Sequence, residues 1–277
     1  MKRAVTFYVL AVALGVLAAL PLWFDPRGLK APYLATLALG MMWTPAIAAY
    51  ICLRATRAPR PFADLLALRK PAQSGVHVLL AIALPLLFSI GAIALGTFFG
   101  VYDYEPPRSA LAALGMLAVV IPAGFVNALP ALGEEIGWRG YLLNELRDWP
   151  PLPADVLIGV VWGLWHAPLI LLGYNYPTAP VLGAFVLMPS MCVLLSIWIG
   201  WLRRRSNSTW IAALAHGASN ASATLALAMH RHDAAPDTVH ATITGWSGWL
   251  LPAAFALWLA WTGRTAARRS APQPHAA

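Results

Sequence analysis

The feature that most constrains this chain is a series of long apolar stretches that recur along nearly its whole length. Of its 277 residues, 60% are hydrophobic and only 11% are charged, whereas a soluble domain carries about 25% charged residues. Apolar stretches of about 18 or more residues can cross a bilayer as helices. The eight expected spans are 5–24, 32–53, 76–99, 110–133, 155–173, 179–201, 208–230 and 245–263. The sequence therefore predicts an all-α polytopic membrane protein whose first span is kept rather than cleaved as a signal peptide.

The distribution of Lys and Arg predicts how these spans are oriented. If the N-terminus is cytoplasmic, the outer segments hold only Arg27, Lys30, Arg108 and Arg231, and the cytoplasmic segments hold the other 15 of the 19 basic residues. Cytoplasmic loops of membrane proteins are enriched in Lys and Arg. We therefore expect an integral protein of the cell (inner) membrane with both termini in the cytoplasm. Because this topology accounts for most of the net charge of +8, nucleic acid is not an expected partner.

The connections between the spans are short, which predicts one integral membrane domain. Its expected parts are 1–109 with the first three spans and a cytoplasmic loop, 110–230 as the core that carries the motifs below, 231–263 with the last span, and 264–277 as a basic disordered tail. Cys52 and Cys192 lie inside apolar stretches. We expect them to be packing residues rather than a disulfide.

Three ionisable residues fall within six positions at the end of the fourth span, in the segment 133–140. An unpaired charge at bilayer depth costs about 2.5–3.5 kcal/mol on insertion scales. Arg139 lies four residues after Glu135, so the two can pair on one helix face. Glu134 is rotated by about 100° from Glu135 and points elsewhere. The spacing thus predicts one neutralised carboxylate and one that is free for chemistry.

Two further helices carry polar groups at a similar depth. His166 lies in the fifth span, and His216 and Asn220 share a face of the seventh span. At 1.5 Å per residue, Glu134, His166 and His216 lie about 18, 15 and 12 Å from the cytoplasmic helix ends. We therefore expect one buried site in the cytoplasmic half of the membrane, opening towards the cytoplasm. Taken singly, each histidine could instead bond a backbone carbonyl, and the Glu135–Arg139 pair could simply order a helix end.

These residue types allow more than one chemistry. A shielded carboxylate and a histidine can activate a water, while His216 and the Asn220 amide donate hydrogen bonds to a tetrahedral oxyanion. Glu134, His166 and His216 could instead hold Zn²⁺ with an open position for water. A proton-coupled carrier and a non-catalytic scaffold are the alternatives from other functional classes.

The order of the motifs along the chain indicates a family. The pattern Glu134-Glu135-x-x-x-Arg139, Trp162-x-x-x-His166 and His216-x-x-x-Asn220 resembles the type II CAAX prenyl endopeptidases, in particular the bacterial-type CPBP or abortive-infection-like intramembrane proteases. The resemblance covers about residues 110–230. It implies that Glu134 and His166 activate water, that His216 and Asn220 stabilise the oxyanion, and that Glu135 and Arg139 support the site. The family commonly has Phe where this chain has Trp162, and we expect that change to be conservative.

The resemblance also implies a partner and a choice of mechanism. It implies a membrane-associated peptide or protein substrate within the lipid bilayer, with prenylated CAAX-type proteins as one candidate class. Members of the family have been described both as metalloproteases and as metal-free glutamate proteases. The chain lacks a His-Glu-x-x-His spacing, which favours the glutamate type without a cofactor. Zinc remains the alternative.

Overall fold

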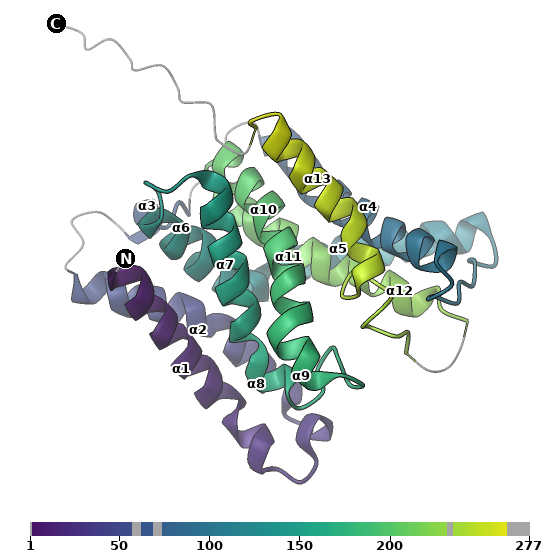
Figure 1. The fold of residues 1–277 in the computed structure, drawn as a ribbon, viewed down its shortest axis with the longest axis horizontal. Coiled ribbons are helices and arrows are strands. Elements are labelled where there is room, and N and C mark those ends of the chain that lie inside the picture. Colours follow the sequence, from purple (N-terminus) through teal and green to yellow (C-terminus); the bar gives the residue numbers. More distant parts are fainter. Residues whose placement is uncertain (1, 57–61, 69–73, 232–234, 265–277) are drawn as a thin grey trace, which may run out of the picture.

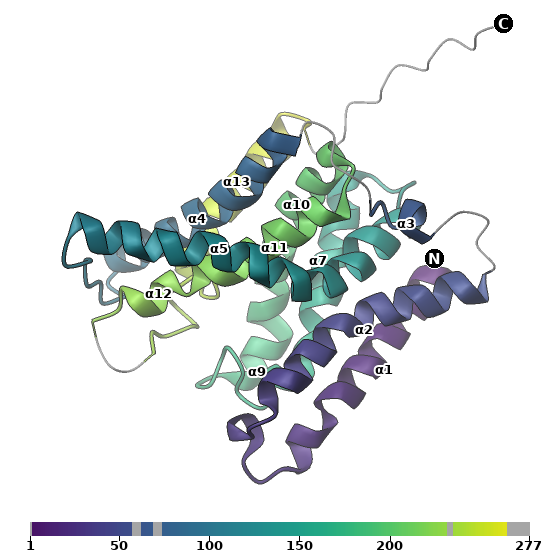
Figure 2. The ribbon, with the colours of Figure 1, turned by 180° about the vertical axis from the view of Figure 1, so that it is seen from behind.

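The computed structural model is helical in all the elements that it describes, which cover residues 2–56, 62–68, 74–231 and 235–264 (Figures 1 and 2). Within those ranges the only β-type pairing is an isolated bridge between Tyr104 and His230. This confirms the predicted all-α class. The predicted disordered tail lies outside the described residues except for Arg264.

Five helices are long and apolar enough to cross a membrane. They are α1 (Lys2–Phe24), α2 (Leu34–Ala55), α4 (Ser74–Phe98), α5 (Ala110–Glu135) and α10 (Met188–Ser206), the last two with continuations. Helix α5 continues through the π-helix η2 (Ile136–Leu142) into α6 (Leu143–Glu145), and α10 is preceded by α9 (Pro180–Leu182) and the π-helix η3 (Gly183–Leu187). These helices confirm a polytopic membrane fold.

The other three expected spans form shorter or interrupted helices. They are α7 (Pro151–Trp165) with α8 (Ala167–Ile170), α11 (Thr209–Ala223) with α12 (Leu225–Ala228), and the 3₁₀ turn η4 (Trp246–Trp249) with α13 (Leu250–Trp261). The break between α7 and α8 falls at His166, because Pro168 has no N–H to offer the carbonyl of Leu164. The count of eight spans therefore stays a prediction. Two short elements, η1 (Gly28–Lys30) and α3 (Phe62–Leu65), complete the described fold.

One end of the bundle gathers the segments that carry most of the arginines, and we call it the arginine-rich end. There the start of α1 packs on η2, with the rings of Phe7 and Tyr141 5.0 Å apart. The start of α11 is tied to the segment after α3, since the Thr209 N–H donates to the Ala67 carbonyl at 3.0 Å. The start of α7 is joined to the end of α10 by the Asp155–Arg204 ion pair.

The opposite end, which we call the loop end, joins the connections that were predicted to lie outside the cell. The Trp23 indole at the end of α1 donates to the Pro168 carbonyl in α8 at 2.9 Å. The Tyr176 hydroxyl in loop 171–179 donates to the Thr244 carbonyl at 3.0 Å. These contacts place the loops after α1, α8 and α12 together, away from the arginine-rich end.

Glycines allow the site helices to approach closely. A Cβ on Gly133 would lie 2.7 Å from the Met42 carbonyl oxygen of α2, and one on Gly163 would lie 2.3 Å from the Cα of Pro189 in α10. Gly137 and Gly159 make the same kind of contact with the same two helices. The four-residue glycine spacings thus mark helix interfaces, as small residues do in membrane bundles. Cys52 and Cys192 are buried and free, which confirms their packing role.

Candidate active site

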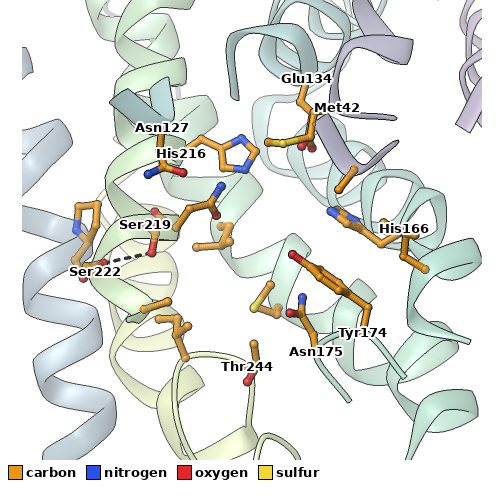
Figure 3. Close-up of a pocket in the computed structure, with 18 of the residues that line it drawn as sticks. Met42, Asn127, Glu134, His166, Tyr174, Asn175, His216, Ser219, Ser222 and Thr244 are labelled. Atoms are coloured by element: carbon orange, nitrogen blue, oxygen red, sulfur yellow. Dashed lines mark hydrogen bonds between the residues drawn. The ribbon is translucent and has the colours of Figure 1, made fainter. Parts of the chain in front are cut away.

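A cavity of about 400 Å³ lies among α2, α4, α5, the α7–α8 break, α10 and α11 (Figure 3). The predicted residues Glu134, His166, His216 and Asn220 all line it. The polar residues that share the lining are Asn127, Tyr174, Asn175, Ser219, Ser222 and Thr244, with Ser89 from α4. The structure therefore brings the side chains of three distant motifs to one cavity.

Glu134 occupies the cavity wall at the last turn of α5 and is only 2% exposed. The Trp162 indole N–H of α7 donates to its Oε2 at 2.6 Å. The Arg139 guanidinium lies over the Trp162 ring, 4.4 Å from the ring centre. Phe could not make this hydrogen bond, so the expectation that Trp162 is merely a conservative aromatic replacement is incomplete. In this chain Trp162 holds the carboxylate of Glu134.

Glu135 is fully buried and sits in a separate ion-pair cluster. Its Oε1 accepts a hydrogen bond from Arg139 Nη1 at 2.7 Å, which confirms the pair predicted from the spacing. The same oxygen accepts from His216 Nδ1 at 2.9 Å. A buried charge requires partners of this kind. Glu135 therefore links the arginine to the second histidine, a connection that the sequence did not predict.

The hydrogen bonds of the two histidines engage Nδ1 of each ring and leave Nε2 available to a water or a substrate. His166 Nδ1 lies 2.9 Å from the Trp162 carbonyl oxygen. A carbonyl can only accept, so Nδ1 carries the proton and Nε2 keeps a lone pair for a water. His216 donates from Nδ1 to Glu135, so its Nε2 can donate only when the ring is an imidazolium. Glu135 supplies the counter-charge that this form requires.

The amides near the cavity differ in how they are engaged. Asn220 follows His216 by one helical turn and is exposed where it lines the cavity. Asn127 also lines the cavity, but its Nδ2 donates to the Ala123 carbonyl of its own helix at 2.9 Å. Asn220 is therefore the amide better placed to meet a bound peptide.

Sequence reasoning missed the loop residues of the lining. Tyr174 and Asn175 come from loop 171–179, and Figure 3 shows the Tyr174 hydroxyl pointing into the cavity. The loop is anchored by Tyr176, which is 0% exposed. Gly173 and Asn175 have φ of +100° and +62°, a conformation that Gly and Asn tolerate best. A run of Gly, Tyr and Asn after a helix was the available signal, but it has no periodicity to interpret.

The cavity lining also includes residues of the loop end. Tyr174, Asn175 and Thr244 bring the loop end into its lining. Trp138, Arg139 and Trp162, which lie outside the lining, are buried. The side of the membrane towards which the cavity opens stays a prediction.

The zinc alternative depends on how the donor side chains are arranged. Among the described residues, no three His, Cys, Asp or Glu side chains are grouped so that they could hold one metal ion. The alternative set of Glu134, His166 and His216 thus lines one cavity without forming a ligand cluster.

Comparison with known proteins identifies the segment that contains these motifs. Residues 107–222 match the family model described as type II CAAX prenyl endopeptidase Rce1-like. The protein named CAAX prenyl protease 2 of Methanococcus maripaludis is 40% identical over 57 residues, which are 20% of this chain and 21% of the relative. The aligned part spans about a fifth of that relative's length. These matches confirm the predicted resemblance to type II CAAX prenyl endopeptidases, and the bacterial-type branch stays a prediction.

Proposed function

Residues 107–222 carry the type II CAAX prenyl endopeptidase pattern, and we propose that this protein is an intramembrane endopeptidase. The observation that carries the proposal is the meeting of Glu134, His166, His216 and Asn220 on one cavity, with Glu134 outside the Glu135–Arg139 ion pair. The substrate is a membrane-associated peptide or protein, and prenylated CAAX-type proteins are one candidate class. The protein resides in the inner membrane with both termini in the cytoplasm.

The proposed reaction begins with a water held between Glu134 and His166. The lone pair on His166 Nε2 orients the water, and Glu134 takes a proton as the water oxygen attacks the peptide carbonyl carbon. The carbonyl oxygen becomes an oxyanion that accepts hydrogen bonds from Asn220 and from the His216 imidazolium. When the C–N bond breaks, Glu134 returns its proton to the amine nitrogen.

Glu135 and Arg139 act as positioning residues in this scheme. Glu135 accepts from His216 Nδ1 and so fixes the ring orientation, in the way that a carboxylate orients a catalytic histidine in other hydrolases. Arg139 neutralises Glu135, so that Glu134 does not have to ionise beside a second negative charge. We favour the metal-free glutamate mechanism on this arrangement and keep zinc as the alternative.

The test is peptide cleavage by purified protein in detergent or liposomes. A prenylated CAAX-type peptide and a library of membrane-associated peptides are supplied to wild type, Glu134→Ala and His166→Ala, with chelator in half of the reactions. We expect cleavage by wild type with and without chelator and none by either variant. If chelator abolishes cleavage and added zinc restores it, the metal-free mechanism is wrong and a zinc-dependent mechanism replaces it. Failure of folded wild type to cut any peptide, or full cleavage by Glu134→Ala, would contradict the proposal.

A further inference from the structure

We propose that a second cavity, at the arginine-rich end, binds the phosphate group of an anionic lipid. The cavity has a volume of about 230 Å³, far above the roughly 10–15 Å³ that one water needs. It lies between the α6–α7 connection and the end of α10, and it shares no lining residue with the active-site cavity. The inference goes beyond the proposed endopeptidase function and does not depend on it, because lipid binding is measured without catalysis.

The lining of this second cavity is basic and contains no acidic side chain. Four arginines contribute to it, namely Arg139, Arg147, Arg203 and Arg204. Two buried carboxylates outside the lining, Glu135 and Asp155, pair with Arg139 and Arg204. The Asp148 carboxylate lies 3.9 Å from Arg147 but is 90% exposed, so water screens this pair. The charge of the lining therefore favours an anion.

Arg139 provides a second observation that points to a ligand. It is 1% exposed, and its Nε and Nη2 have no hydrogen-bond partner, whereas Nη1 donates to Glu135. The Trp162 ring lies 4.4 Å from the guanidinium and attracts its charge, but it offers these two nitrogens no acceptor atom. Even a shift of Nη2 onto the unpaired Glu135 Oε2 would leave Nε unsatisfied. Nε and Nη2 form one edge of the guanidinium, and such an edge binds phosphate oxygens in a bidentate manner.

The start of α7 adds a favourable helix dipole. Helix α7 begins at Pro151, which lines the cavity together with Ala154 of the same turn. This first turn has no acidic residue and no side-chain cap. The N-terminus of a helix carries partial positive charge and attracts anions. An anion in the cavity is therefore stabilised by the guanidinium groups and by this helix end together.

The apolar part of the lining indicates that the phosphate belongs to a lipid. Leu143, Leu146 and Trp149 line the cavity beside the arginines, and Trp149 is 38% exposed. Tryptophan is enriched at the headgroup level of membranes, and basic pockets between transmembrane helices bind the head groups of anionic lipids. A free phosphate ion would meet the same arginines but would gain nothing from the apolar side chains. A phospholipid uses both parts of the lining.

The experiment measures binding to the delipidated full chain in detergent micelles. Phosphatidylglycerol, phosphatidylcholine or inorganic phosphate is added at equal ionic strength. The thermal unfolding midpoint is recorded, and retained lipid is counted by native mass spectrometry. The test variant Arg147→Gln/Arg203→Gln removes two charges from the lining, and the matched control Arg205→Gln/Arg264→Gln removes two charges outside it.

Each shift is taken relative to the same variant without ligand, because Arg203 also donates to Thr209 at 3.2 Å and its loss lowers the starting midpoint. Arg147→Gln alone, at an exposed position, replaces the double variant if the latter does not fold.

We expect phosphatidylglycerol to raise the midpoint of wild type and of the control by several degrees, because a ligand that binds only the folded state stabilises it. Phosphatidylcholine and inorganic phosphate should shift the midpoint much less. In the test variant the shift and the retained lipid should both fall by at least half. Stabilisation by inorganic phosphate alone would overturn the lipid as the source of the phosphate. Equal responses to the two lipids, equal shifts in the test and control variants, or no shift with any ligand would overturn the inference.

Discussion

Glu134 and Glu135 are neighbours in the chain but lie in different environments. Glu134 faces the cavity and receives one indole N–H from Trp162. Glu135 is fully buried and is shared by Arg139 and His216. The difference shows how one helix turn can supply both a reactive carboxylate and a structural one. Rotation by about 100° per residue separates the two roles, and the single nearby guanidinium decides which carboxylate is neutralised.

The largest effect is expected from removing the arginine that supports this division. Arg139→Met leaves Glu135 as a buried carboxylate without its guanidinium partner. Breaking such a pair costs about 3–5 kcal/mol. We expect a large fall in the thermal unfolding midpoint in detergent and loss of cleavage.

The matched control removes both charges. In Glu135→Leu/Arg139→Met no uncompensated charge remains, and buried ion pairs can often be replaced by apolar residues without loss of stability. We expect the unfolding midpoint to recover while cleavage stays low, because His216 has lost its acceptor. Recovery of cleavage in the double variant would show that Glu135 has no positioning role.

The second-largest effect on cleavage is expected from removing a hydrogen-bond donor to the oxyanion. Asn220→Ala removes an exposed amide, so the unfolding midpoint should stay within about a degree. Loss of one oxyanion donor costs about 10²–10³ in kcat, and KM should change little. Steady-state kinetics on a cleaved peptide measure both constants. A rise in KM with unchanged kcat would assign Asn220 to substrate binding instead.

A smaller effect is expected from the contact peculiar to this chain. Trp162→Phe keeps an aromatic ring beside Arg139 but removes the N–H that donates to Glu134. A hydrogen bond to a charged group contributes about 1.5–3 kcal/mol, so kcat should fall about tenfold or more. Trp165→Phe, whose indole donates to Thr44 instead, is the control. Equal losses in the two variants would mean that packing, not the Glu134 contact, is responsible.

The smallest effect on cleavage is expected at the arginine-rich end. Asp155 is 1% exposed and pairs with Arg204 at 2.8 Å, away from the cavity lining. Asp155→Asn should lower the unfolding midpoint by several degrees. Cleavage per folded molecule should stay within twofold of wild type. A tenfold loss would show that the two ends of the bundle are coupled.

Local spacing predicted the parts of the site that depend on a single helix. The Glu135–Arg139 pair follows from a four-residue separation, and the small-residue spacings marked the faces that pack on α2 and α10. The arrival of His166 and His216 at the same cavity as Glu134 followed from counting residues along three spans. The roles assigned to these residues stay predictions.

Contacts between different helices, or between helices and loops, could not be predicted from local spacing in the sequence. Helix periodicity gives the direction of a side chain about its own axis but not the partner that it meets. The His216–Glu135 and Trp162–Glu134 hydrogen bonds depend on how three helices dock. Tyr174 and Asn175 lie in a loop shaped by positive φ angles and by a buried Tyr176. Asp155 was overlooked because it fell on the first residue of an expected span.

The most direct test of the account replaces each neighbouring carboxylate by its neutral amide. Glu134→Gln and Glu135→Gln are purified side by side, and the cleavage rate per folded molecule and the thermal unfolding midpoint are measured for both. We expect Glu134→Gln to lose cleavage by about 10³ or more while keeping the wild-type midpoint. We expect Glu135→Gln to lower the midpoint clearly because Arg139 loses its charged partner. The division between the two carboxylates would be contradicted if Glu134→Gln lost stability and Glu135→Gln lost only cleavage. It would also be contradicted if both variants lost stability and cleavage equally.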